Sequence, residues 1–157
     1  MTALHTPCHT QDSISFFFED GADKAVFTGD TLFIGGCGRF FEGDAKQMHK
    51  ALNETLAALP NDTKVYPGHE YTKGNVRFAK KVLNNDAIKK LDDFSQANKE
   101  TQGKFTIGDE KVSIDWSSQR LLCVRKSFLT NRRSTMSSCA FMIPTFKSWS
   151  VRQSPLK

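Results

Sequence analysis

Short runs of β-branched and aromatic residues alternate with longer, helically spaced segments over the first two-thirds of the chain. Residues 13–18 (Ser-Ile-Ser-Phe-Phe-Phe) and 25–28 (Ala-Val-Phe-Thr) predict two strands, and the Glu-Asp-Gly between them supplies turn residues. This hairpin would deliver Asp30 at its carboxyl end. A brief strand at residues 64–66 is followed by a Pro-Gly pair, which places His69 in the next loop.

Three later segments predict helices. Apolar residues recur at helical spacing over residues 45–59, Asp44 suits the N-cap position, and a proline ends the run. Two further helical stretches are expected around residues 75–83 and 86–99. Because strands and helices interleave along the chain, the predicted fold class is α/β.

The sequence changes character near Lys111. Residues 1–111 contain 14 Lys and Arg against 16 Asp and Glu, whereas residues 112–157 contain 8 against 1 and are rich in Ser and Thr. We therefore expect a folded domain over residues 1–111 and a separate, poorly ordered basic tail over residues 112–157. Since the net charge of +5 belongs to that tail, the body lacks the positive surface typical of nucleic-acid binding.

Composition also bears on compartment and partners. No run of about 18 apolar residues is present, and the first residues lack the basic flank and apolar stretch of a signal peptide. The four cysteines are scattered without a C-x-x-C pair and are interpreted as reduced thiols. We expect a cytoplasmic monomer that binds neither membranes nor nucleic acid.

Three residues carry the candidate chemistry. His9, Asp30 and His69 each follow a short apolar or β-rich segment, and the loops after such segments gather at one edge of a sheet. Two imidazoles and a carboxylate would suit a divalent transition metal such as zinc, and the carboxylate could bridge two ions. Each residue taken singly is more often a solvated or hydrogen-bonded side chain, so the prediction depends on all three together.

These residues belong to a set of motifs that occur in a fixed order. The motifs are Thr-Pro-Cys-His-Thr (6–10), Phe-Thr-Gly-Asp-Thr-Leu-Phe (27–33), Gly-Cys-Gly-Arg-Phe-Phe-Glu-Gly (36–43), Tyr-Pro-Gly-His-Glu-Tyr (66–71), Asn-Val-Arg-Phe-Ala (75–79) and Phe-Thr-Ile-Gly-Asp (105–109). As a set they resemble the hydroxyacylglutathione hydrolase, or glyoxalase II, family of the metallo-β-lactamase fold. The resemblance implies a partial αββα sandwich, the carboxyl half of that fold, over residues 1–111.

The resemblance also implies a metal site. His9 matches a ligand of the family's first metal, Asp30 its bridging carboxylate, and His69 a ligand of the second metal. Two zinc ions are expected, with iron or manganese as alternatives. In the family a hydroxide held between the ions attacks the thioester of S-D-lactoylglutathione and releases D-lactate and glutathione, a step of methylglyoxal detoxification.

Substrate contacts are implied in the same way. Arg39 matches a basic residue that contacts a glutathione carboxylate, Tyr71 matches an aromatic contact to the glutathione backbone, and His69 lies beside it. Phe41 stands where many members have a tyrosine, so one hydroxyl is lost. The alternative is that Phe40 and Phe41 are core residues and Arg39 is a surface charge.

The chain also departs from the family pattern. The family's H-x-H-x-D-H motif has no copy here, so we expect an incomplete site and no activity of the chain alone. Without the other β-layer, one sheet face should expose Phe16, Phe18 and Val26. If a further segment precedes this chain, a mitochondrial form is the alternative to the cytoplasmic one.

Two other functions remain possible at this stage. A catalytically inactive truncated paralogue or interaction protein is supported by the absent motif. A nucleic-acid binder would have to use the basic tail, where no pattern of stacking aromatics accompanies the arginines.

Overall fold

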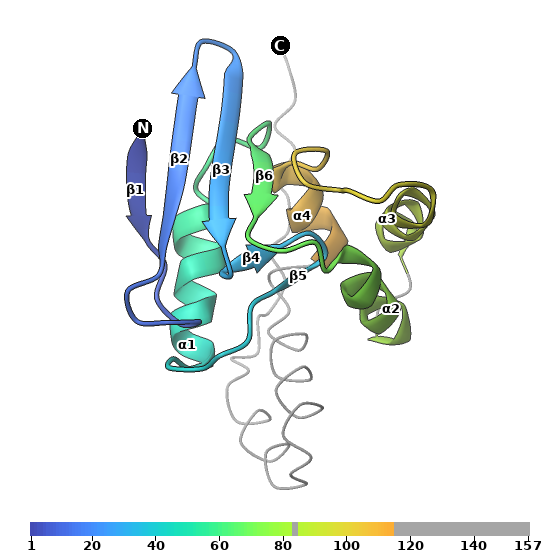
Figure 1. Cartoon of the computed structure of the whole chain (residues 1–157), viewed down its shortest axis with the longest axis horizontal. Helices are drawn as coiled ribbons and strands as arrows, with labels where there is room; N and C mark the ends of the chain where they lie inside the picture. The colour runs from blue at the N-terminus through green and yellow to red at the C-terminus, as the bar shows by residue number, and fades with distance from the viewer. Residues whose placement is uncertain (83–84, 115–157) are drawn as a thin grey trace, which may run out of the picture.

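The structure is a computed structural model that describes residues 1–82 and 85–114 (Figure 1). The expected tail lies outside these residues from position 115 onward, so its lack of order stays a prediction. Helix α4 (Ile107–Ile114) runs through the expected boundary after Lys111, and Ser113 within it is buried. The described residues combine strands and helices, which confirms the α/β class. No helix among them is long and apolar enough to cross a membrane.

Four strands form the main sheet, in the order β1-β2-β3-β6. They are β1 (Thr2–His5), β2 (Ile14–Asp20), β3 (Asp23–Gly29) and β6 (Lys64–Pro67). The predicted hairpin is confirmed: β2 pairs antiparallel with β3, and the turn uses Gly21 at φ 57°. β6 lies parallel to β3, so the two strands end at the same edge. The edge strand β1 was not predicted.

A small second hairpin follows the sheet. Strands β4 (Leu32–Phe33) and β5 (Gly36–Cys37) pair antiparallel around Gly35, whose φ of 70° suits glycine. Both residues of β4 are buried. This hairpin therefore fixes the loop that leaves Asp30 and the loop that leads to Arg39.

The predicted first helix has two parts. α1 (Ala45–His49) begins with a capping box in which Asp44 accepts from the Gln47 backbone and the Gln47 side chain accepts from the Asp44 backbone. It continues as the π-helical segment η1 (Lys50–Leu56). Met48, Leu52 and Leu56 form its buried face, as the apolar spacing predicted.

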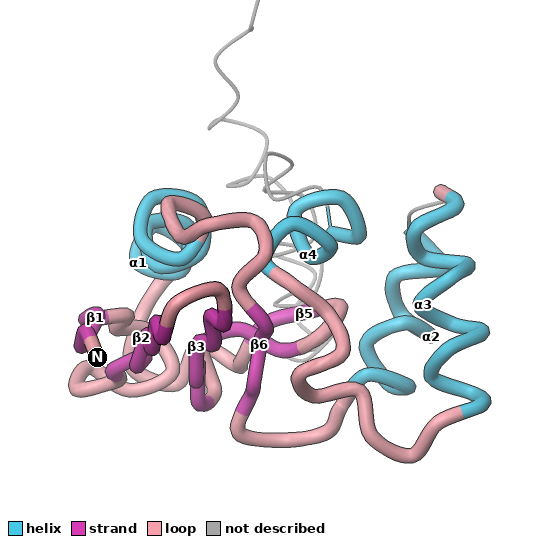
Figure 2. The backbone as a smooth tube through the Cα atoms, turned by 90° about the horizontal axis from the view of Figure 1, so that it is seen from above, coloured by secondary structure: helices cyan, strands magenta, loops and turns pink. Residues whose placement is uncertain are grey.

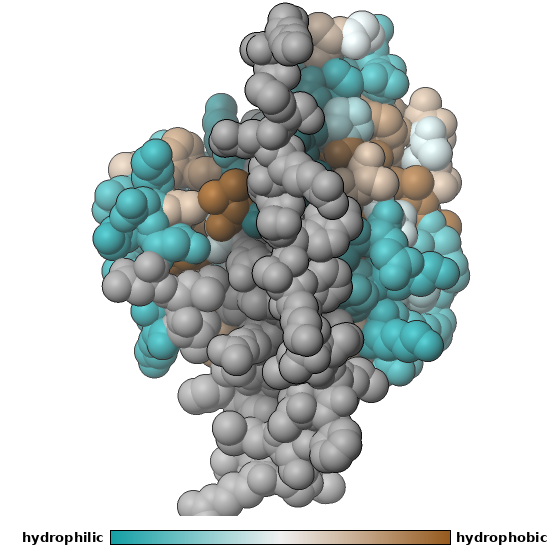
Figure 3. Space-filling model, turned by 180° about the vertical axis from the view of Figure 1, so that it is seen from behind, coloured by the Kyte–Doolittle hydropathy of each residue, from teal (hydrophilic) through white to brown (hydrophobic). Residues whose placement is uncertain are grey.

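Two of the remaining helices lie where the sequence predicted them, whereas α4 was not predicted. α2 (Thr72–Val82) and α3 (Asp86–Ala97) pack against each other, and the Asn85 side chain caps α3 by accepting from the Ile88 N–H. Figure 2 shows α1 and α4 on one face of the sheet, with α2 and α3 beyond the β6 edge. Seen from behind relative to Figure 1, the surface that grey atoms do not cover is hydrophilic over much of its lower part (Figure 3).

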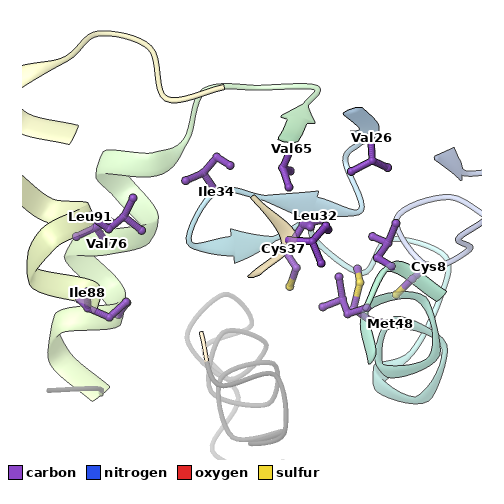
Figure 4. Packing of buried hydrophobic residues seen from close by; sticks show 14 residues of the cluster. Cys8, Val26, Leu32, Ile34, Cys37, Met48, Val65, Val76, Ile88 and Leu91 are labelled. Carbon is purple, nitrogen blue, oxygen red and sulfur yellow. The ribbon is translucent and has the colours of Figure 1, made fainter. Parts of the chain in front are cut away.

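The core fills the space between the sheet and these helices. Val26 and Val65 face it from the sheet, Met48 from α1, and Leu91 from α3 (Figure 4). Ile34, from the β4–β5 turn, lies in the same buried cluster. The core therefore holds the hairpin that carries the site against the sheet and against the α2–α3 pair.

The other face of the sheet is aromatic and exposed, as expected, but its members differ from the prediction. Phe16, Phe18 and Phe27 are 39–45% exposed, whereas Val26 is fully buried. Placing Val26 on the exposed face was wrong. Phe16 is the register partner of Phe27, and side chains alternate along a strand, so Phe27 joins the phenylalanines and Val26 points toward the helices.

Candidate metal centre

Asp30 directly follows β3, and glycines surround it. The Gly68 N–H donates to the Gly29 carbonyl at 2.8 Å, which joins the end of β6 to the end of β3. A β-carbon built on Gly68 would lie 2.8 Å from Asp30 Oδ1, too close for a real contact. A side chain at position 68 would therefore push against the Asp30 carboxylate, and glycine lets the loop carrying His69 approach it.

Asp30 receives two histidines from distant parts of the chain. His9 Nε2 lies 3.2 Å from Asp30 Oδ2, and His69 Nε2 lies 3.5 Å from the same oxygen. The three side chains come from the loops after β1, β3 and β6. The structure thus brings together the three residues that the sequence predicted as metal ligands.

The ring of His9 is oriented by the loop that carries Arg39. His9 Nδ1 lies 2.9 Å from the Arg39 carbonyl oxygen, which can only accept, so Nδ1 carries a proton. In the neutral ring, Nε2 then turns its lone pair toward the negative oxygen of Asp30. That juxtaposition is repulsive unless a proton or a cation lies between the two atoms. A ring nitrogen held by a carbonyl while the other faces outward is the usual arrangement of a metal-binding histidine.

The fit to a metal ion is partial. Two ligands on a tetrahedral zinc ion, with bonds of about 2.0–2.2 Å, stand about 3.3–3.5 Å apart, close to both His–Asp separations. Over residues 1–82 and 85–114, however, no three His, Cys, Asp or Glu side chains are arranged so that they could hold a metal ion. The donors are correct in kind and in pairwise spacing, but this set does not complete a site.

Arg39 and Phe41 flank His9 on the surface. The Arg39 guanidinium carbon lies 5.1 Å from the centre of the Phe41 ring, and that ring contacts His9 edge-on at 4.9 Å. Phe41 is 62% exposed, so the alternative that made it a core residue is wrong. Phe40, by contrast, is partly buried against the core, as that alternative held.

Tyr71 and His69 form the other flank. Their rings stack with centroids 5.1 Å apart, and Phe33 meets the Tyr71 ring edge-on at 5.2 Å. Tyr71 is half exposed. Phe33 was not predicted as part of the site, although its place in the motif Gly-Asp-Thr-Leu-Phe was a signal that could have pointed to it.

The loops carrying His9 and Arg39 are also tied to each other. The Gly43 N–H donates to the Cys8 carbonyl at 2.9 Å, and a β-carbon at Gly43 would lie only 2.5 Å from Cys8 Cα. The Gln11 N–H donates to the Glu42 carboxylate at 2.6 Å. Three loops far apart in sequence are therefore fixed around one carboxylate.

The described residues form a sheet with helices on one face and a His-Asp-His cluster at its edge. Comparisons with known families identify the class of protein. The model described as "Metallo-beta-lactamase superfamily" matches residues 2–69, and the model described as "Hydroxyacylglutathione hydrolase C-terminus" matches residues 70–113. The chain belongs to the hydroxyacylglutathione hydrolase family of the metallo-β-lactamase superfamily, as its motifs predicted. Its family implies that it binds divalent metal ions.

Several curated relatives support this assignment. The chain is 62% identical over 109 residues to the Schizosaccharomyces pombe protein "Probable hydroxyacylglutathione hydrolase glo2", covering 69% of this chain and 43% of that protein. It is 43% identical over 121 residues to the cytoplasmic isozyme of Saccharomyces cerevisiae, covering 70% of this chain and 44% of the relative. The mitochondrial hydroxyacylglutathione hydrolase of the same yeast is also 43% identical, over 122 residues that cover 70% of this chain and 43% of that protein. The chain spans less than half the length of these relatives.

Proposed function

We propose that this chain takes part in the hydrolysis of glutathione thioesters, with S-D-lactoylglutathione as substrate and D-lactate and glutathione as products. The observation that carries this proposal is the approach of His9 Nε2 and His69 Nε2 to one oxygen of Asp30. The names of the relatives support the same reaction.

Three side chains of this chain would hold the metal. His9 would bind one divalent ion, His69 a second, and the Asp30 carboxylate would bridge them, with zinc as the expected metal and iron or manganese as alternatives. Ions in such a site lower the pKa of water toward about 7 and polarise the carbonyl oxygen of the substrate. The Arg39 carbonyl would keep the His9 ring in the tautomer that offers its Nε2 lone pair.

The exposed residues on either side would bind the glutathione part. The Arg39 guanidinium can form a paired hydrogen bond with a glutathione carboxylate. Phe41 and Tyr71, both more than half exposed, offer apolar surfaces for the tripeptide backbone. His69, stacked on Tyr71, would contribute to both the metal and the substrate sides of the site. We further propose that the protein acts as a monomer in the cytoplasm, with mitochondria as the alternative. One Saccharomyces cerevisiae relative is named as a cytoplasmic isozyme and another as mitochondrial.

The experiment uses the full chain with and without a partner segment. The purified chain, given zinc and S-D-lactoylglutathione, should hydrolyse it no faster than zinc-containing buffer, because residues 1–82 and 85–114 do not complete a site. Adding the segment of a relative that carries H-x-H-x-D-H, fused or as a separate chain, should produce saturable turnover. His69→Ala in that assembly should remove most of it.

Two outcomes would contradict the proposal. Turnover that is unaffected by His69→Ala would rule out the assigned ligand. If the two parts co-elute and bind zinc without hydrolysing the thioester, that result would contradict the assigned reaction.

A second candidate is a non-catalytic interaction protein. It is favoured by the incomplete ligand set among the described residues and by the exposed ring surface of Phe16, Phe18 and Phe27. This candidate predicts a different result in the same experiment. The partner segment would bind, but neither added zinc nor His69→Ala would change that binding or produce turnover.

A further inference from the structure

Glu70 stands between His69 and Tyr71, and its carboxylate points to a different set of residues. The Thr101 N–H donates to Glu70 Oε2 at 2.7 Å, and the Thr101 hydroxyl donates to the same carboxylate at 2.8–2.9 Å. The Thr72 N–H donates to Oε1 at 3.3 Å. One surface carboxylate is therefore held by two backbone N–H groups and a hydroxyl.

The available protons fix which group donates in each hydrogen bond between Glu70, Thr101 and Thr72. Both oxygens of the Glu70 carboxylate receive backbone N–H donors, Oε1 from Thr72 and Oε2 from Thr101, so the carboxylate is the acceptor here. The single hydroxyl proton of Thr101 goes to Glu70. The Thr72 hydroxyl, 2.6 Å from the Thr101 hydroxyl, must then be the donor between those two.

Thr101 is a fixed point in the fold. It is 1% exposed, and the segment after it runs along β6. The Gly103 N–H donates to the Val65 carbonyl at 2.8 Å, and the Val65 N–H donates to the Phe105 carbonyl at 2.9 Å. Glu70 thus ties the loop after β6 to a segment that is itself paired with β6.

The side chains on either side of Glu70 face the candidate site. His69 and Tyr71, two positions apart, stack at 5.1 Å with their planes 24° apart. The His69 side chain is 52% exposed, so packing from its surroundings constrains it little. The backbone between the two rings helps to set their relative position, and the hydrogen bonds of Glu70 fasten that backbone.

We propose that Glu70 is a positioning residue that holds His69 and Tyr71 in their stacked arrangement by anchoring their shared backbone to Thr101 and Thr72. It touches neither metal nor substrate. The inference rests on the proposed roles of His69 and Tyr71 for its functional meaning. Exposed ionic hydrogen bonds contribute little to global stability, so its effect should be local.

The test reads ring geometry in the metal-free, full-length chain by NMR. A nuclear Overhauser cross-peak between the His69 and Tyr71 rings should be present in the native chain and lost in Glu70→Ala. The cross-peak between Phe18 and Phe27, whose centroids are 5.5 Å apart, should survive and shows that the sheet is intact. Glu100→Ala, an equal change of charge at an exposed position beside Thr101, should leave both cross-peaks unchanged.

A second pair of variants covers the case in which Glu70→Ala does not fold. Thr101→Val removes the hydroxyl donor at nearly constant volume and should weaken the His69–Tyr71 cross-peak, while Thr101→Ser should restore it. A His69–Tyr71 cross-peak of native intensity in Glu70→Ala, or in Thr101→Val if the first variant is unfolded, overturns the proposal.

A zinc titration of the chain assembled with the H-x-H-x-D-H segment, followed at the His69 signals, separates this proposal from the proposed function. Glu70→Ala should weaken zinc binding about tenfold, the lower end of the effect of groups that orient metal ligands. If native His69 does not respond to zinc, the metal role assigned to it fails, whereas the ring cross-peaks still decide the role of Glu70. If zinc binds the native chain and Glu70→Ala equally well with the stack intact, the positioning role alone fails.

Discussion

Gly38 lies directly against the backbone of Asp30. A β-carbon at Gly38 would stand 1.7 Å from the Asp30 carbonyl oxygen and 3.4 Å from His9 Nδ1, and the Gly38 N–H donates to Thr31 at 3.1 Å. The obstacle is backbone rather than a flexible side chain. Any residue other than glycine at this position must move either Asp30 or the loop that carries Arg39.

We therefore expect Gly38→Ala to displace Asp30 and to reduce the turnover of the assembled site by about 100-fold or more, equivalent to about 2.7 kcal/mol of barrier. Gly74→Ala is the matched control, because a β-carbon there meets nothing within 4 Å and the residue lies in α2. That variant should keep full turnover and gain about 0.5–1 kcal/mol of stability. Equal activities of the two variants would show that the Asp30 position does not matter.

Arg39 should act on substrate binding rather than on the reaction. Arg39→Ala in the assembled protein is expected to raise KM about tenfold with little change in kcat, because a charge that contacts a distant carboxylate binds the ground and transition states alike. Arg39→Lys keeps the charge without the planar guanidinium, so its KM should lie between those of the native protein and Arg39→Ala. Steady-state kinetics with S-D-lactoylglutathione measure both constants, and a fall confined to kcat would place Arg39 in the chemistry instead.

Glu110 should make the fold less stable as pH rises. Its side chain is fully buried, Oε2 accepts from the Gly35 N–H at 3.0 Å, and Oε1 has no partner among the described residues. Burial raises the pKa of Glu110 from its ordinary 4.5 to about 8. The folded state therefore holds a proton that the unfolded state releases, so this contribution to stability is complete below about pH 4.5 and is lost as pH rises to about 8.

Urea unfolding of the full chain would measure this effect over a pH range that brackets both the ordinary pKa of Glu110, 4.5, and its raised pKa of about 8. Glu110→Gln keeps an acceptor for the Gly35 N–H but cannot ionise, so its stability should fall less with rising pH than that of the native chain. Glu100→Gln, the same change at an exposed position, should keep the native slope. Parallel slopes for the native chain and Glu110→Gln would contradict the assignment.

The two faces of the sheet should respond differently to the loss of apolar side chains. Met48→Ala empties part of the core and should cost about 2–5 kcal/mol in the free energy of unfolding. Phe27→Thr, at a position 45% exposed, should cost less and should lower the binding of the dye ANS, because it removes a ring from the exposed aromatic face. Denaturant titration and dye fluorescence check both expectations, and a Phe27→Thr cost as large as that of Met48→Ala would show that the aromatic face is packed in solution.

The local pattern was sufficient for most of the elements and for the family. Alternation and turn residues determined the β2–β3 hairpin, and the apolar spacing with its Asp44 cap determined the first helix, because these signals depend on neighbours a few residues away. Edge strand β1 was not predicted, because only four residues pair and two of its side chains are polar. Val26 was placed on the wrong face because adjacent strand residues point to opposite sides, and only the register with Phe16 decides which.

For the site, the sequence determined the residue types and tertiary structure decided their geometry. The motifs and their family resemblance singled out His9, Asp30 and His69, and folding brings two ring nitrogens to 3.2 and 3.5 Å from one oxygen. The link from His9 to the Arg39 carbonyl and the anchoring of Glu70 by Thr101 join residues about thirty positions apart. Such contacts leave no local periodicity in a single sequence, because only the fold brings together the distant loops that form them.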